Sequence, residues 1–281
     1  MSTLLILGAT GNVGSNTINA LRERNFDGTV RAASRQANAT FGGYAQPVRF
    51  DFADADTFAP ATAGADAVFF NVPPVHPDLI SLVGPYIDYL REHGPKRVVH
   101  LSAFGAEHLP VYGPVIETVQ AAGFDLTVLE PTFFASNFGT YEREGIEHRN
   151  MIFQASGEGR TGYVNPADIG HAAAVVLTQE GHVGKTYRLT GPEALSLHEV
   201  AQQLSDVRGV PTQYVPATEQ QYRSALAEAQ VPSFVADYMV PLYDLLREGK
   251  VEALSPDLKR LTGRDPLPLR TQLERDFGAA A

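Results

Sequence analysis

A glycine-rich segment near the start of the chain constrains its fold more than any other feature. Gly8-Ala9-Thr10-Gly11-Asn12-Val13-Gly14 follows the apolar run 4–7 and precedes apolar residues at helical spacing. One glycine lets the backbone turn sharply off a strand, a second allows close approach of a ligand, and a third lets helix and strand pack. The context predicts a dinucleotide pyrophosphate site at the helix N-terminus, where backbone N–H groups favour anions. A tight turn without a ligand is the alternative.

Composition narrows the class of protein. The chain has 281 residues, of which 44% are hydrophobic and 19% charged, as expected for one large globular domain or a domain with a smaller lobe. A net charge of −10 with scattered Lys and Arg argues against nucleic-acid binding. Cysteine is absent, which excludes disulfides and thiolate chemistry. No membrane-length apolar run or signal sequence is recognisable, so we expect a cytoplasmic protein with no membrane partner.

Short apolar runs alternate with helical patterns through the first half of the chain. Strands are expected at residues 4–7, 30–33, 47–50, 67–70, 97–101 and 126–129. Between two of them, Leu79, Val83, Tyr86 and Leu90 share one face of an expected helix. This alternation predicts an α/β fold, with a doubly wound parallel sheet and helices on both faces.

The pattern is looser after about Pro131. A helix is expected from Pro166 to Leu177 and a strand over 186–189, and Ser196 and Glu199 have the spacing of a capping box. The region 219–281 is helical in pattern and interrupted by prolines. We therefore expect residues 1–131 to form the nucleotide-binding core. Residues 132–281 would supply returning strands and helices plus a small substrate-binding lobe, interleaved within one domain overall.

The end of the second expected strand indicates which dinucleotide binds. NAD-binding folds place an acidic residue there to bind the ribose hydroxyls, whereas this chain has Ser34 and Arg35 and no acidic residue. A guanidinium suits the geometry of a 2′-phosphate, and a serine hydroxyl can add a hydrogen bond. We expect NADP(H), with a solvated loop charge as the alternative for Arg35.

Two further strand ends are expected beside the adenosine. Asp51 and Phe52 follow the third strand, where Asp51 either accepts a hydrogen bond from the adenine amine or begins a turn. Asn71, Val72, Pro73 and Pro74 follow the fourth strand. Because prolines cannot continue a central strand, the chain is expected to leave the sheet there, alongside the ribose.

The chain resembles the NmrA-like, atypical short-chain dehydrogenase/reductase family, whose members have a Rossmann fold. Besides the segments above, the resemblance is carried by Leu101-Ser102-Ala103-Phe104-Gly105, by 121–131 with Phe133, Phe134 and Asn137, and by 166–169 and 187–192 with Val200. It extends to about residue 215 and is loose over the last sixty residues or so. The family includes reductases of quinones, enones, imines and phenylpropanoids, and redox-sensing regulators that bind dinucleotide without turnover, so fold alone does not decide the function.

The resemblance implies catalytic positions, but the chain departs from the usual pattern. No tyrosine is followed four residues later by lysine, and Tyr112 stands where atypical members usually have Lys or His. A phenol is a poor base at neutral pH but a competent donor, so Tyr112 is expected to polarise or protonate a carbonyl oxygen. Ser102 would flank the nicotinamide and hold the same oxygen. The alternatives are a surface or packing phenol for Tyr112 and a structural hydroxyl at a strand end for Ser102.

Aromatic side chains follow the sixth strand, where the nicotinamide is expected. Phe133 and Phe134, after Pro131, are expected to form an apolar floor for a flat substrate, or else to belong to the core. The other candidate substrate contacts are Asn137, Tyr163 and Met239. The expected cofactor contacts are Gly8, Thr10, Gly11, Asn12, Val13, Gly14, Ser34, Arg35, Asp51, Phe52, Asn71, Val72, Pro73, Ser102, Pro131 and Phe133.

Other chemistries find little support in the sequence. The scattered histidines lack metal-ligand spacing, so no metal site is expected, and no GxSxG elbow surrounds Ser102. The leading hypothesis is an NADPH-dependent reductase of a quinone, enone or ketone-like aromatic molecule, acting as a monomer or homodimer. One alternative is a non-catalytic NADP(H) sensor that binds a partner protein. Another is a non-redox isomerase, epimerase or cyclase that retains its cofactor.

Overall fold

A computed structural model describes residues 2–36, 38–73 and 75–278, so Pro74 of the expected ribose segment lies outside the described residues. The chain divides by its internal contacts into two compact units. The first unit comprises Met1–Pro131, Pro166–Arg188 and Asp257–Arg264. The second comprises Thr132–Asn165, Leu189–Pro256 and Asp265–Ala281.

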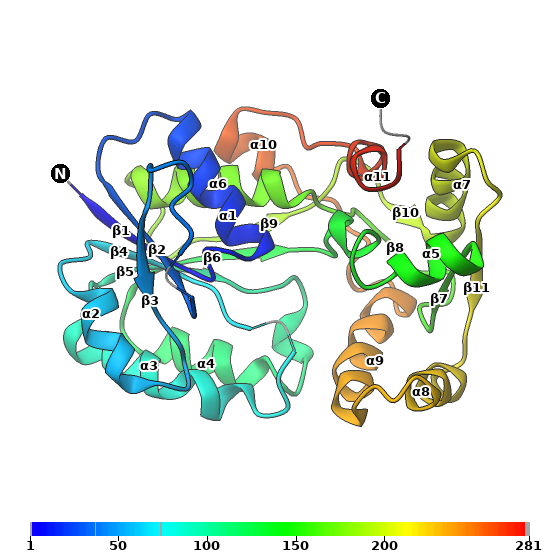
Figure 1. Cartoon of the computed structure of the whole chain (residues 1–281), viewed down its shortest axis with the longest axis horizontal. Helices are drawn as coiled ribbons and strands as arrows, with labels where there is room; N and C mark the ends of the chain where they lie inside the picture. Colours follow the sequence, from blue (N-terminus) through cyan, green and yellow to red (C-terminus); the bar gives the residue numbers. More distant parts are fainter. Residues whose placement is uncertain (1, 37, 74, 279–281) are drawn as a thin grey trace. The chain divides into compact units, whose positions relative to one another are not determined.

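The first unit is built on a seven-stranded sheet with the strand order β3-β2-β1-β4-β5-β6-β9 (Figure 1). The strands are β1 (Thr3–Leu7), β2 (Thr29–Ser34), β3 (Gln46–Arg49), β4 (Ala67–Phe70), β5 (Arg97–Leu101), β6 (Asp125–Pro131) and β9 (Thr186–Leu189). Pairing from β3 through to β6 is parallel, with Ile6 opposite both Ala32 and Phe69. Strand order reverses between β1 and β4, which confirms the doubly wound α/β prediction.

Helices cover both faces of this sheet (Figure 1). One face carries α1 (Asn12–Glu23), α6 (Pro166–Thr178) and α10 (Asp257–Thr262), and the other carries α2 (Phe58–Thr62), α3 (Leu79–His93) and α4 (Gly113–Ala121). Two 3₁₀ turns, η1 (Ala55–Thr57) and η2 (Ala106–His108), lie in the connections. Because both faces are covered, β4 is buried along its whole length, which is why its sequence is a continuous apolar run rather than an alternating one.

An aromatic cluster packs beneath the sheet on the α3 side. Tyr86 of α3 lies edge-on to Phe50 and Phe58, with ring centroids 4.6 and 4.8 Å apart, and its hydroxyl is 2.9 Å from that of Thr62. Phe52 joins the same cluster, 4.9 Å from Phe50. Burial of such rings removes large apolar areas from water, so this cluster stabilises the segment that follows β3.

On the opposite face of the sheet, helices α1 and α6 pack unusually close to each other. Gly170 of α6 lies against the backbone of α1, where a Cβ atom would come 2.5 Å from the carbonyl carbon of Asn16. The surrounding residues of α6, among them Ala173 and Ala174, are fully buried. Small side chains let the two helices pack backbone to backbone, which holds α1 firmly against β1 and its glycine turn.

The second unit contains two short sheets and several helices. Its strands are β7 (Met151–Gln154) paired in parallel with β11 (Gln213–Pro216), and β8 (Arg160–Thr161) paired antiparallel with β10 (Leu195–Ser196). Its helices are α5 (Arg143–Arg149), α7 (Leu197–Arg208), α8 (Glu219–Glu228), α9 (Ser233–Arg247) and α11 (Leu269–Phe277), with the 3₁₀ turn η3 (Ala135–Asn137). Its core includes Phe138, Ile152, Leu204 and Leu273.

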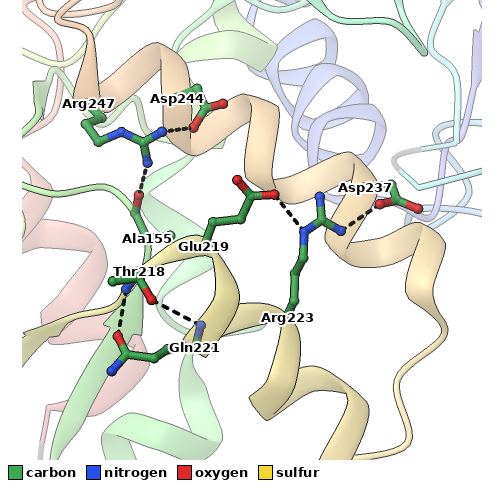
Figure 2. Close-up of polar contacts among 8 residues, drawn as sticks. All are labelled: Ala155, Thr218, Glu219, Gln221, Arg223, Asp237, Asp244 and Arg247. Atoms are coloured by element: carbon green, nitrogen blue, oxygen red, sulfur yellow. Dashed lines mark hydrogen bonds and ion pairs between the residues drawn. The ribbon is translucent and has the colours of Figure 1, made fainter.

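Side-chain contacts fix α8 and α9 to the rest of the second unit (Figure 2). Arg223 of α8 binds Glu219 at 2.8 Å on its own helix and Asp237 at 2.7 Å on α9. Arg247, near the end of α9, donates to the carbonyl of Ala155 at 2.9 Å and also binds Asp244. Thr218 caps α8. The expected capping box of Ser196 and Glu199 is present at the start of α7.

No helix within residues 2–36, 38–73 and 75–278 is both long enough and apolar enough to cross a membrane.

The glycine contact between α1 and α6 predicts the result of a substitution. Gly170→Ala should lower the free energy of unfolding by about 1–3 kcal/mol, because the new methyl group overlaps the α1 backbone. Gln120→Ala is the control: Gln120 is an exposed residue of α4, so helix propensity should make that change neutral or slightly stabilising. Chemical denaturation of both variants tests this, and equal stability would contradict the packing argument.

Candidate functional site

The turn after β1 has the geometry that anion binding requires. Gly8 has φ +62°, a left-handed conformation, and a Cβ there would lie 3.0 Å from Nδ2 of Asn71. At Gly14, a Cβ would come 2.2 Å from the Gly8 carbonyl oxygen, so only glycine lets α1 start this close to the turn. Gly11 is the N-cap of α1, with no side-chain cap on the first turn. The first N–H groups of a helix have no partners within it and attract phosphate oxygens.

A cavity of about 560 Å³ opens beside this turn. It is lined by Thr10, Ser34, Arg35, Gln36 and Asn38. Arg35 is exposed, and its guanidinium forms no ion pair or hydrogen bond with the residues that the structure describes. Ser34 is buried and donates to the carbonyl of Gln36 at 2.6 Å. An unpaired guanidinium in a polar cavity next to a helix N-terminus can bind a phosphate group. The sequence prediction missed Gln36 and Asn38, which follow Arg35 by one and three positions.

The expected adenosine residues lie at the ends of β3 and β4. One carboxylate oxygen of Asp51 accepts from the N–H of Ala53 at 3.0 Å, so Asp51 organises the turn after β3. Phe52 contributes its ring to the aromatic cluster. After β4, Asn71 is partly buried next to Gly8, Val72 is buried and Pro73 is partly buried. The roles of these residues toward adenosine remain predictions.

Two expected catalytic residues lie beyond β5 in the first unit. The N–H of Ser102 donates to the Leu129 carbonyl at 2.9 Å, which aligns the residue with the end of β6. Its Oγ is buried and has no hydrogen-bond partner among the described residues. Tyr112 is the N-cap residue of α4 and is 9% exposed. An unsatisfied buried hydroxyl is costly, so the Ser102 hydroxyl is suited to bind a group absent from the chain itself.

Neighbouring polar groups support the segment that carries these residues. The Arg188 guanidinium lies 4.4 Å above the ring of Phe104 and its Nε is 3.7 Å from Glu130, a carboxylate at the end of β6. Burial raises the pKa of Glu130, and Glu107 adds to this, while Arg188 opposes it. The Phe104 N–H donates to the Pro131 carbonyl at 2.9 Å. Sequence reasoning did not identify Glu130 or Arg188, because their proximity depends on the pairing of β6 with β9.

His100 of β5 is fully buried, but one of its two ring nitrogens has no hydrogen-bond partner among the described residues. Its Nδ1 is 3.4 Å from the Phe70 carbonyl, and its Nε2 has no partner in the described part of the chain. Burial lowers the pKa of His100 to about 4, so the ring is neutral near pH 7. No group of three or more potential metal ligands occurs among the described residues.

The remaining expected substrate residues belong to the second unit. Phe133 is partly buried and packs against its core. Phe134 forms an isolated β-bridge with Val164. The carbonyl of Asn137 accepts from the N–H groups of Thr140 and Glu142, both at 3.2 Å, so its backbone organises a turn. Met239 is partly buried in α9.

A polar cluster lies within the second unit, and Tyr163 is the member that the sequence analysis named as a candidate substrate contact. We call it the Glu142 cluster, and it consists of Glu142, Gln154, Tyr163, Tyr214, Tyr222 and Tyr243. Gln154 donates to Oε1 of Glu142 at 2.8 Å and accepts from Ser156 at 3.1 Å. The hydroxyls of Tyr222 and Tyr243 are 3.4 Å apart. Tyr163 is 4% exposed, and its hydroxyl has no partner among the described residues.

Burial dominates the electrostatics of this cluster. Desolvation raises the pKa of Glu142 to about 7, and the hydrogen bond from Gln154 opposes that rise. Desolvation likewise raises the pKa of Tyr163, Tyr222 and Tyr243, and the Glu142 charge adds to each shift. No cation is bonded to Glu142 within the described chain, so the hydrogen bond from Gln154 is the contact that favours its charged form against desolvation.

Comparison with known proteins adds to this geometry. Residues 8–180 match the model of an NAD(P)H-binding family. The chain is similar to an NAD(P)H azoreductase of Xenophilus azovorans, with 31% identity over 99% of this chain and 100% of the relative. Its fold is similar to an NADPH-dependent quinone oxidoreductase of Escherichia coli crystallised with NADPH, with a TM-score of 0.87, 23% identity, and coverage of 99% and 100%. Citrobacter triphenylmethane reductase gives a TM-score of 0.84 at 24% identity, covering 99% of each chain.

The desolvated carboxylate of Glu142 predicts that its replacement stabilises the protein, and that the size of this gain depends on pH. A raised pKa in the folded protein means that Glu142 contributes stability below its unfolded pKa, and that this contribution is lost as pH rises toward 7. Glu142→Gln keeps the size and an acceptor oxygen. It should therefore stabilise the protein at pH 8 by about 1–3 kcal/mol, with a much smaller gain at pH 5. The four tyrosines stay neutral across this range.

Denaturant unfolding at pH 5, 6, 7 and 8 measures this effect. Glu144→Gln is the control, because Glu144 lies in the first turn of α5, two residues after Glu142, with a side chain that is 74% exposed. A stability difference for Glu142→Gln that is constant with pH would contradict the assignment of a desolvated carboxylate.

Proposed function

The chain belongs to the NAD(P)H-binding family, within the NmrA-like, atypical short-chain dehydrogenase/reductase class, and from this premise we propose that it is an NADPH-dependent reductase. Its proposed substrates are quinones, enones or ketone-like aromatic molecules. The names of its relatives describe reduction of azo compounds and quinones, both flat conjugated acceptors, which supports this class of substrate.

The observation that carries the cofactor preference is the cavity around Arg35. An NADH-specific site needs a carboxylate at the end of β2 to bind two ribose hydroxyls. Here the same position offers an unpaired guanidinium, the Ser34 hydroxyl and the side chain of Asn38. A 2′-phosphate would complete this set with charge-assisted hydrogen bonds, and NADH would leave it unsatisfied.

The glycine turn and the end of β5 support the placement of the rest of the cofactor. The α1 N-terminus binds the pyrophosphate through backbone N–H groups, and the lack of a Cβ at Gly8 and Gly14 allows that approach. The buried, unpartnered Oγ of Ser102 fits a polar group of the nicotinamide end or of the substrate.

When bound, the reduced nicotinamide supplies the hydride that reduces an electrophilic carbon of the acceptor. The chain's own residues hold and protonate the acceptor oxygen. In this proposal Ser102 donates a hydrogen bond to that oxygen and stabilises the negative charge that develops on it. Tyr112 delivers the proton from its phenol, and solvent restores it. A phenol fits this direction of proton transfer better than the reverse reaction, because it is a weak base at neutral pH.

Cofactor preference is testable at one side chain. Arg35→Ala should weaken NADPH binding by about 10- to 100-fold, because it removes a charge-assisted contact to the 2′-phosphate, and should change NADH binding less than threefold. Isothermal titration calorimetry with each cofactor measures both dissociation constants. Arg91→Ala, which removes an exposed arginine of α3 paired with Asp88, serves as the control. Equal losses for NADPH and NADH would contradict the assignment.

Turnover tests the proton donor. Tyr112→Phe should lower kcat for ketone-like or quinone acceptors by about 100-fold or more while NADPH affinity is retained. Oxidation of NADPH, followed by its absorbance, reports the rate, and Tyr141→Phe is the control because Tyr141 is 64% exposed. An unchanged kcat would be consistent with a reductase but would contradict the assignment of Tyr112 as its proton donor. If the protein binds NADPH but reduces no acceptor, the alternative of a non-catalytic NADP(H) sensor would be favoured.

A further inference from the structure

Three polar side chains lie in a row across the end of the sheet in the first unit. In the parallel register of β5 with β6, Leu101 is opposite Leu129. The N–H of Ser102 continues this ladder by donating to the Leu129 carbonyl, so Ser102 lies opposite Glu130. On the other side of Glu130, Nε of Arg188 on β9 is 3.7 Å from Oε2 of the carboxylate. Because neighbouring strands are about 4.8 Å apart and opposed side chains point to the same face, Glu130 lies between a hydroxyl and a guanidinium.

The Glu130 carboxylate is a strong potential acceptor for the Ser102 hydroxyl, but the two groups are not hydrogen-bonded. The Oγ of Ser102 is buried and has no hydrogen-bond partner among the described residues. The Glu130 side chain is 19% exposed, and a hydroxyl bound to a carboxylate forms a charge-assisted bond that is stronger than a neutral one. His100, two residues before Ser102 on the same face, is farther away at about 6.6 Å along the strand. A further contact must therefore direct the carboxylate away from the hydroxyl.

The contacts of Arg188 explain the direction of the Glu130 carboxylate. The guanidinium carbon of Arg188 lies 4.4 Å above the ring of Phe104, which holds the side chain over this face of the sheet. Its backbone N–H donates to Oδ2 of Asp257 at 3.1 Å, which fastens β9 at the same residue. A guanidinium has several donors in a fixed plane, so it can stack on a ring and still bind a carboxylate. Arg188 therefore draws the Glu130 carboxylate toward β9.

We propose that Arg188 is a positioning residue of the reductase site, which keeps the Ser102 hydroxyl free to donate to the acceptor oxygen by holding the Glu130 carboxylate at β9. A serine hydroxyl has one proton to donate, so a hydrogen bond to Glu130 and one to the acceptor exclude each other. Without the guanidinium, the carboxylate would turn toward Ser102 and accept that hydrogen bond. The inference rests on the proposed function, in which Ser102 is the donor.

Crystal structures test the positioning step without turnover. In Arg188→Met, which keeps a long unbranched side chain over Phe104, a carboxylate oxygen of Glu130 should lie about 2.5–2.7 Å from Oγ of Ser102. That contact should be absent from the unchanged chain and from Arg91→Met, the control, which replaces an exposed arginine of α3. A Glu130 carboxylate that stays at β9 in Arg188→Met would overturn the proposal.

Turnover gives a second readout, which a purely structural role of Arg188 would not reproduce. Arg188→Met should lower kcat for a quinone acceptor about tenfold, because the developing negative charge loses a donor. Adding Glu130→Met removes the competing acceptor and should restore most of that loss, whereas damage to the stack on Phe104 would persist in the double variant. In a Ser102→Ala background, Arg188→Met should change kcat less than twofold. A double variant as slow as Arg188→Met would overturn the proposal.

The two measurements separate failure of this inference from failure of the proposed function. If quinone is reduced and Arg188→Met leaves kcat unchanged, the reductase is supported and the positioning role is contradicted. If no acceptor is reduced but the Glu130 carboxylate binds Ser102 in the Arg188→Met crystal, the control of Ser102 by Arg188 is supported and the reductase is contradicted.

Discussion

Close backbone packing around α1 is the constraint on which the nucleotide-binding part of this structure depends. At one end, Gly14 places the helix against the carbonyl of Gly8. Along its length, Gly170 of α6 lets a second helix approach its backbone. The two contacts fix the direction of α1 relative to β1, and therefore the direction in which its first N–H groups point. Phosphate binding needs that direction to be set before a ligand arrives, because preorganised donors do not have to reorient on binding.

The local part of the fold is predictable from the sequence, and the long-range part is not. Short apolar runs correctly predicted the six strands β1 to β6. The strand β6 is longer than its predicted range of 126–129, because it extends from Asp125 to Pro131. Backbone pairing with neighbouring strands lengthens a strand past the residues that its side chains identify. Periodicity gave no indication that Asp257–Arg264 belongs to the first unit, because α10 reaches it through contacts with residues far away in sequence.

The same distinction applies to the site. The glycine turn and Arg35 were recognisable because each depends on a few consecutive residues after a strand. Gln36 and Asn38 adjoin Arg35 and were within reach of the same reasoning. Of the Glu142 cluster, Tyr163 was named from the sequence, but the other members were not, since they come from separate segments between residues 142 and 243 and belong to no motif. Desolvation of the Glu142 carboxylate is expected to lower stability at neutral pH, which is a pattern found where function and stability compete.

The division of the chain into interleaved units has a consequence for its synthesis. The first unit takes its residues from three segments, and the last of these ends at Arg264. The ribosome adds residues from the N-terminus, so β9 at the edge of the sheet and α10 over α6 emerge long after β1 to β6. During that interval the outer edge of β6 and part of the surface of α6 have no partner. A nascent chain stalled before residue 186 would thus expose the edge of β6, and one stalled between residues 189 and 257 would still lack the helix that packs on α6. Open strand edges and uncovered helix faces are the surfaces that chaperones recognise and that promote aggregation.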